Sequence, residues 1–279
     1  MKNLIIFQNP EEIIQQNFFI NFNLGEEFIK KIKFPNRRID LSEENDFIFI
    51  VMYIAEYDLK LKVVNQIELN IFFHKETQHL YLFAYNTKYF FEKYKVEFEH
   101  LNFHDFGEFI EFFFDIVLKD EVKIIEHILE DTYQIKSEFF AKANSATLIR
   151  HLTNNEINIS TLKLISATQN KLLDLLKPYL QYTHQTQIDY ERNNILDELN
   201  FANEFCHTLM SSINTKYNVK EADAIHKLNS IMLVIFVTDL VTTLLLYLFD
   251  GGKHTYLFGI GIMSIITTYI VVTRNKNTK

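Results

Sequence analysis

The feature that most constrains this chain is a pair of long apolar segments close to its C-terminal end. Residues 230–249 read SIMLVIFVTDLVTTLLLYLF, twenty residues with one charge. At about 1.5 Å rise per residue, they form about 30 Å of helix, which matches the hydrocarbon core of a bilayer. Residues 256–272 read YLFGIGIMSIITTYIVV and carry no charge. We expect two transmembrane helices joined by an external loop, residues 250–255. Two buried helices of a soluble domain are the alternative, but core helices of this length usually keep a polar face.

The distribution of basic residues predicts how this hairpin is oriented, because cytoplasmic flanks of membrane spans are enriched in Lys and Arg. The stretch before the first span and the tail, residues 273–279, hold three basic residues each, whereas the loop between the spans holds one. These residues are Lys216, Lys220 and Lys227, then Arg274, Lys276 and Lys279, and in the loop Lys253. We expect both termini to be cytoplasmic, in the inner (cytoplasmic) membrane of the cell.

A long helix is expected to lead into the first span. No Gly or Pro occurs between Tyr179 and Asp250, and apolar residues recur at three-and-four spacing through a stalk at residues 186–229. This seam consists of Ile195, Leu199, Ala202, Cys206, Leu209, Ile213 and Tyr217. A single projecting helix cannot bury it, which favours self-association. Alternatively, the seam closes a bundle within one subunit against helices expected at Glu108–Phe140 and Ile157–Leu180, and both arrangements are compatible.

The remainder of the chain predicts an α+β cytoplasmic part. Residues 1–107 form an α/β domain, in which Phe47–Ile54 is a continuous apolar run typical of a buried strand. Residues 67–71 alternate apolar with polar, and His79–Tyr85 follows after a polar turn, which indicates a hairpin. A cytoplasmic helical segment, residues 108–185, then connects this domain to the stalk.

Composition and motifs exclude several classes of function. The chain has 28 basic and 36 acidic residues, a formal charge of -8, so it lacks the basic face expected of a nucleic-acid partner. It has one cysteine, and its histidines show no zinc-site spacing. It contains no phosphate-binding glycine loop, HExxH helix, nucleophile elbow or CxxC motif. We therefore do not expect an enzyme, a catalytic residue or a covalently bound cofactor.

One polar group inside the first span is a candidate functional site. Asp239 lies near the middle of the span, where a charge costs roughly 2.5–3.5 kcal/mol on insertion scales. Thr242 and Thr243 follow at the positions that share its helix face. Such residues usually face a bundle interior or a water-filled path. Alternatively, the carboxyl group of Asp239 is neutral or hydrogen-bonded to a neighbouring helix.

Acidic residues of the stalk form a weaker candidate site. Asp189 and Glu191 begin a series of carboxylates along this helix. A solvated helix face is the simplest interpretation. Oxygen ligands for a hard divalent cation between subunits, in a regulatory role, are the alternative.

The order of these elements resembles the CorA family of magnesium transporters. The similarity is strongest from about Tyr190 to Val241. Within this range NTKYNVKEADAIHKLNSIMLVIFV, residues 214–237, is similar to the Asn-Glu-x-x-Lys approach to the first span in that family. The resemblance implies a homopentamer in the lipid bilayer whose first spans line a pore for metal ions, magnesium above all. It assigns the pore lining to Asp223, His226, Ser230, Leu233 and Val237. It also points Leu240 rather than Asp239 toward the pore, so the two assignments differ by a fraction of a turn.

One departure from the family lies at the external end of the first span. The Gly-Met-Asn signature, which receives hydrated magnesium in the family, is absent. Ungapped matching places Tyr247, Leu248 and Phe249 there, and the nearest glycines are in Gly251-Gly252-Lys253. Neither segment supplies the asparagine carbonyl, and Lys253 would add positive charge at the entrance. The expected function is a divalent-cation transporter or channel; a CorA-like membrane scaffold or sensor that does not conduct is the alternative.

Overall fold

The computed structural model describes residues 4–7, 26, 30, 39–44, 46–84, 105–141, 145–248 and 259. The chain divides into two compact units, Met1–Met210 and Ser211–Lys279. The first unit contains a five-stranded sheet, helices α5 and α6, and the first part of helix α7. The second contains the rest of α7. This arrangement confirms the expected α+β class.

The sheet has the strand order β1-β5-β4-β3-β2. Neighbouring strands are antiparallel, except that β1 runs parallel to β5. The hairpin of β3 and β4 is the longest pairing and runs in register from Phe47↔His74 to Asp58↔Val63. The strands are β1 (Leu4–Phe7), β2 (Asp40–Glu44), β3 (Phe47–Asp58), β4 (Val63–His74) and β5 (His79–Ala84).

The central strands form where the sequence is apolar and rich in β-branched and aromatic residues. Strand β3 is buried along most of its length, as the continuous run from Phe47 predicts. Aromatic rings of neighbouring strands stack across the sheet, with centroids 4.3 Å apart for Phe49 and Phe72. The buried strand and the hairpin with β5 are therefore confirmed. Strand β2, DLSEE, was not predicted, because its polar sequence forms an edge strand only through its pairing with β3.

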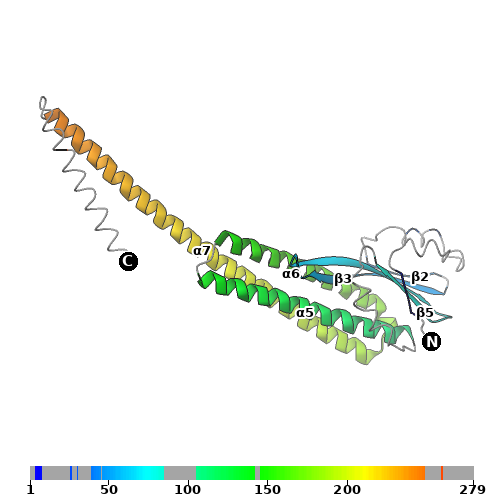
Figure 1. The fold of residues 1–279 in the computed structure, drawn as a ribbon. Helices are drawn as coiled ribbons and strands as arrows, with labels where there is room; N and C mark the ends of the chain where they lie inside the picture. The colour runs from blue at the N-terminus through cyan, green and yellow to red at the C-terminus, as the bar shows by residue number, and fades with distance from the viewer. Residues whose placement is uncertain are drawn as a thin grey trace. The chain divides into compact units, whose positions relative to one another are not determined.

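Three long helices follow the sheet (Figure 1). They are α5 (Phe106–Phe140), α6 (Ser145–Leu176) and α7 (Tyr182–Leu248), with a 3₁₀ turn, η1 (Lys177–Tyr179), between the last two. Asp105 begins α5 as its N-cap, because its Oδ1 accepts a hydrogen bond from the Glu108 N–H at 2.9 Å. The ring of Phe106 then stacks on Phe73 of β4, with centroids 4.9 Å apart, so the first turn of α5 packs on the sheet.

Helix α6 begins at Ser145, earlier than the expected start at Ile157. The extra turns were missed because one of their buried positions is an asparagine, Asn155, and Asn158 follows it directly after the expected start; each is 1% exposed. Asn158 binds the end of the β3–β4 hairpin: its Nδ2 donates to the Lys62 carbonyl at 2.9 Å, and its Oδ1 accepts from the Val64 N–H at 2.9 Å. A buried amide that satisfies two backbone groups does not appear in an apolar periodicity.

Candidate functional site

Helix α7 carries every candidate site residue that the structure describes. It is unbroken from Tyr182 to Leu248, so the stalk and the first apolar segment are one continuous helix. The absence of Gly and Pro from this stretch accounts for its continuity, since these residues most often end helices. The second apolar segment lies outside the described residues, apart from position 259.

Most of the stalk seam is buried within the first compact unit. Ile195, Leu199, Ala202, Cys206 and Leu209 are at most 6% exposed. Helix α5 contacts this face through Thr132, whose Oγ1 lies 3.5 Å from the Cys206 Sγ, and through Tyr133, whose ring lies 4.8 Å from that of Phe205. The expectation that this part of the seam needs a second subunit is therefore wrong, because α5 packs on it. The alternative, a bundle closed within one subunit, is confirmed for these residues, whereas Tyr217 is 54% exposed.

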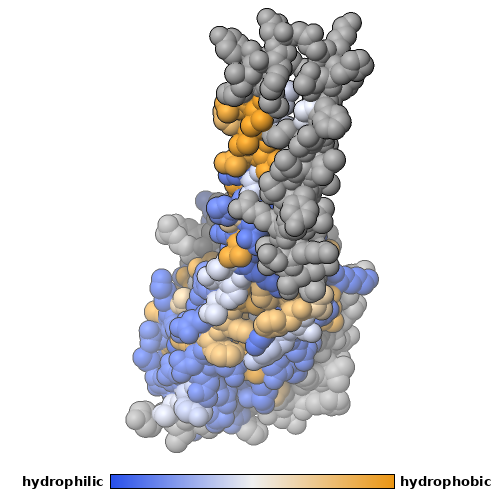
Figure 2. Space-filling model, turned by 90° about the vertical axis from the view of Figure 1, so that its left-hand side faces the viewer, coloured by the Kyte–Doolittle hydropathy of each residue, from blue (hydrophilic) through white to orange (hydrophobic). Residues whose placement is uncertain are grey.

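Beyond the seam, α7 presents large apolar side chains without cover from described residues. Within it, an 18-residue window has a mean hydropathy of 1.6, and none of that window is buried. Figure 2 shows a group of hydrophobic, orange residues on this part of the helix. These include Ile225, Leu228, Ile231, Met232, Leu233, Ile235, Phe236, Val237 and Leu240, each at least 45% exposed. By length and composition, this is one helix that can cross a membrane.

Hydroxyl groups in this apolar stretch are satisfied by the helix itself. Ser230 Oγ donates to the His226 carbonyl at 2.9 Å, Thr238 Oγ1 to the Val234 carbonyl at 2.7 Å, and Thr242 Oγ1 to the Thr238 carbonyl at 2.8 Å. Each bond spans one turn, so these hydroxyls need no water. Such internal satisfaction suits a hydrocarbon environment, where an unpaired polar group is costly.

The unbroken helix separates the two sets of lining candidates. Asp223, His226, Ser230, Leu233 and Val237 follow at steps of three and four residues and therefore lie along one face. At about 100° per residue, the centre of this face lies about 160° around the axis from Asp239. Thr242 lies on the same side of the helix as Asp239. The difference between the two assignments is thus nearly half a turn, and one straight helix cannot direct both sets toward the same path.

The stalk carboxylates Asp189 and Glu191 are not brought together. Two positions apart on a helix, they point about 200° away from each other around the axis. Each has a local partner: Asp189 Oδ1 pairs with Arg192 Nη1 at 3.0 Å, and Glu191 Oε1 accepts from Gln187 Nε2 at 3.2 Å. Among the described residues, no group of three or more His, Cys, Asp or Glu side chains is arranged to hold a metal ion.

The external-loop candidates Gly251, Gly252 and Lys253 lie outside the described residues, as does the basic tail at 273–279. Thr243 belongs to α7 by its backbone, but its side chain is not described.

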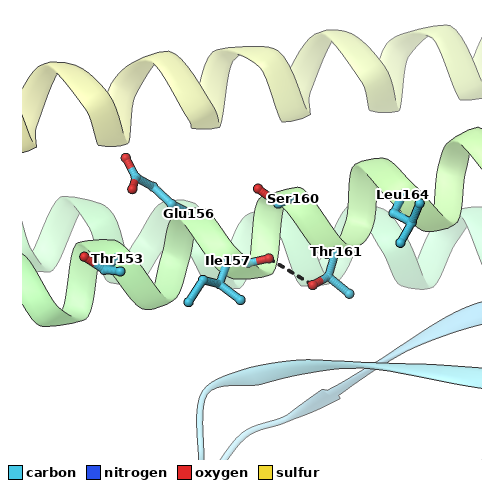
Figure 3. Close-up of a pocket in the computed structure, with 6 residues that line it drawn as sticks. All are labelled: Thr153, Glu156, Ile157, Ser160, Thr161 and Leu164. Carbon is cyan, nitrogen blue, oxygen red and sulfur yellow. Dashed lines mark hydrogen bonds between the residues drawn. The ribbon is translucent and has the colours of Figure 1, made fainter.

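The structure also shows a shallow hollow that sequence reasoning missed. It lies on helix α6, has a volume of about 450 Å³, and is lined by Thr153, Glu156, Ile157, Ser160, Thr161 and Leu164 (Figure 3). Thr161 Oγ1 donates to the Ile157 carbonyl at 2.9 Å. Glu156 Oε1 lies 2.9 Å from His207 Nδ1 of α7. A single carboxylate beside hydroxyls and apolar side chains offers no constellation for catalysis or metal binding.

No protein-family model and no curated protein matches this sequence. Comparison with solved structures does find relatives in fold. The complete CorA magnesium transporter from Methanocaldococcus jannaschii superposes with a TM-score of 0.70 at 13% identity, over 96% of this chain and 88% of that one. The chain has a CorA-like fold.

Two further structures support this assignment of the CorA-like chain. The full-length CmaX protein matches with a TM-score of 0.64 at 13% identity, over 96% of this chain and 86% of its own. The ZntB cytoplasmic domain from Vibrio parahaemolyticus RIMD 2210633 matches with a TM-score of 0.56 at 10% identity, over 78% and 88%. At identities of 10–13%, these comparisons show a shared fold.

Proposed function

We propose that this chain is a membrane transporter or channel for divalent metal cations, with magnesium as its preferred cargo. The observation that carries the proposal is the continuity of α7: one helix contributes to a CorA-like cytoplasmic unit and then exposes an apolar segment long enough to span a bilayer. Hard cations prefer oxygen ligands and retain water, which suits a path lined by carboxylate and hydroxyl groups. The proposal includes no catalytic step and no resident cofactor.

The proposed assembly is a homopentamer in the inner membrane with both termini in the cytoplasm. The exposed apolar residues of α7 need partners, and the bilayer and identical helices of other subunits are the partners of matching chemistry. The basic residues on both cytoplasmic flanks support the orientation. Metal ions are then the cargo, and nucleic acid is not a partner of a chain with charge -8.

We propose that the heptad-spaced face of α7, with Asp223, His226 and Ser230 at its cytoplasmic end and Leu233 and Val237 within the span, lines the path. Helices packed around a common axis direct one continuous face inward. The residues of such a face follow at steps of three and four, as these five residues do. Asp239 and Thr242 then face a neighbouring helix within the bundle, since a carboxylate at mid-bilayer does not favour lipid. Asp189 and Glu191 remain a weaker proposal for a regulatory metal site, which requires ligands from a second subunit.

Flux into liposomes tests the proposed function directly. The purified protein, reconstituted in sealed vesicles that contain a magnesium-sensitive dye, is expected to admit Mg²⁺ down its gradient, and protein-free vesicles are the control. Mass measurement of the same sample in detergent is expected to return a pentamer. A monomer or dimer would contradict the assembly, and the absence of flux of Mg²⁺ and of other divalent cations from a correctly assembled sample would contradict transport.

Replacement of Asp239 by asparagine is expected to change flux, or the metal-dependent shift in melting temperature, without breaking the oligomer. The amide keeps the shape and hydrogen-bonding capacity of the side chain but removes a charge near the middle of the span. A change of about 1 kcal/mol corresponds to roughly fivefold in an equilibrium or rate. Asp239→Leu, which also removes the capacity for hydrogen bonding, is the comparison variant. If both variants conduct and assemble like the parent, the polar stripe has only a structural role.

A further inference from the structure

A buried polar cluster joins α5 and α6 to the sheet, and a buried arginine of α7 acts on it electrostatically. Glu121 of α5, Gln169 of α6 and Arg192 of α7 are 2%, 1% and 9% exposed. The Gln169 amide nitrogen donates to Glu121 Oε1 at 2.7 Å and to the carbonyl of Tyr53, in β3, at 3.2 Å. One amide group thus connects a carboxyl group of α5 to the central hairpin, and the cluster lies within one compact unit.

The charges around Glu121 leave it without a full ion pair. Among the described residues, the ion pair of Arg192 is with Asp189, on its own helix, at 3.0 Å, so its attraction to Glu121 acts at longer range. Asp120 adds negative charge beside Glu121 on α5. Two buried polar atoms, Gln169 Oε1 and Arg192 Nε, have no hydrogen-bond partner within the part of the chain that the structure describes. The interactions of a carboxylate in this position therefore offset little of the free-energy cost of its desolvation.

The same groups make the protonated form of Glu121 favourable. The pKa of Glu121 is raised from 4.5 to about 7 as the net of four influences: burial, the largest, raises it, the hydrogen bond from Gln169 lowers it, Asp120 raises it and the charge of Arg192 lowers it. A protonated carboxyl group has a hydrogen to donate, and Gln169 Oε1 is a buried acceptor with no donor among the described side chains and backbone groups. Protonation also removes the charge that attracts Arg192. Two states of the cluster, with different forces on α7, are thus available near neutral pH.

We propose that Glu121 is a proton-operated switch in the cytoplasmic unit, which holds Arg192 of α7 toward α5 when it is charged and releases it when it is neutral. Because α7 is the helix that continues into the apolar segment, the switch is placed to make transport sensitive to cytoplasmic pH. That consequence rests on the proposed function. The switch within the cytoplasmic unit does not.

The sign of the effect on stability follows from the direction of the pKa shift. A carboxyl group with a raised pKa in the folded protein binds its proton more tightly there than in the unfolded chain. The favourable contribution of Glu121 to the free energy of unfolding is complete below pH 4.5. It is lost as the pH rises to about 7. The full shift corresponds to a change of up to about 300-fold in the unfolding equilibrium, and Glu121→Gln, which cannot ionise, should escape this loss.

The experiment compares melting temperatures of the purified protein in detergent from pH 4.5 to pH 8.5. The advantage of Glu121→Gln over the parent should grow between pH 5 and pH 7 and then level off. Glu126→Gln, an exposed carboxylate of the same helix, is the matched control and should show a constant difference. In Asp120→Asn, the loss of stability with rising pH should occur at a lower pH than in the parent, because Asp120 raises the pKa of Glu121.

A constant difference between Glu121→Gln and the parent at all pH values would overturn the switch. If Glu121→Gln does not fold, an unmoved transition in Asp120→Asn would overturn it instead. Flux at pH 6 and pH 8 forms a separate arm: the parent should respond to pH and Glu121→Gln should not. A parent without flux that still shows the pH-dependent difference in melting temperature contradicts the proposed function and supports the switch.

Discussion

Cysteine placed at Leu233 or Val237 should react with a water-soluble thiol reagent at least about ten times faster than cysteine placed at Met232 or Ile235. The thiolate is the reactive form, and an apolar environment raises the pKa of a thiol. Each unit of that increase lowers the fraction of thiolate about tenfold. All four side chains are at least 45% exposed in the single chain. Only assembly distinguishes them, with the first pair on the proposed lining face and the second on the side of Asp239. The measurement is the labelling rate of the protein reconstituted in vesicles.

The parent protein is the control for background labelling in this experiment. Its one cysteine, Cys206, is fully buried, and burial raises the pKa of its thiol, so it should not react. Fast labelling at Met232 and Ile235 with slow labelling at Leu233 and Val237 would place Asp239 on the conducting side. Equal rates at all four positions would contradict a single lining face.

Replacement of Gly107 by alanine should destabilise the first compact unit by about 1–3 kcal/mol, the usual range for overpacking. A Cβ at this position would lie 2.3 Å from the backbone carbonyl oxygen of Tyr179, closer than atoms approach, and 3.2 Å from Asp105 Oδ1, the cap of α5. The close approach exists because the first turn of α5 packs against the turn η1, where the rings of Phe106 and Tyr179 lie 5.5 Å apart. Relief of the clash requires movement of the backbone of α5 or of η1.

The sign of this effect separates the clash from helix propensity. Without a clash, glycine to alanine within a helix should stabilise by up to about 1 kcal/mol. Asn154→Ala, at an exposed position of α6, is the matched control and should be neutral or slightly stabilising. Thermal unfolding followed by circular dichroism measures both variants. A Gly107→Ala variant as stable as the parent would show that α5 and η1 separate readily.

Local patterns were sufficient for the elements whose signal lies in neighbouring residues. The run from Phe47 became strand β3, and the absence of Gly and Pro after Tyr179 became the unbroken α7. The apolar segment at 230–249 also predicted the exposed, hydrophobic part of that helix. These features depend on side-chain periodicity and on the absence of helix breakers, which are properties of a short stretch of sequence.

Other features were decided by contacts between residues far apart in the chain. Helix α5 covers the seam around Cys206, which a single helix pattern cannot reveal, since an apolar stripe does not specify its partner. Gly107 matters because of the carbonyl of Tyr179, more than seventy positions away. The state of Glu121 depends on Gln169 and Arg192, which only the packing of three helices brings together. The sequence alone thus determined the central strands, most of the long helices and the exposed apolar segment of α7. Which polar groups lose water, and beside which charges, was decided by the tertiary structure, because burial and electrostatic environment are properties of the packed chain.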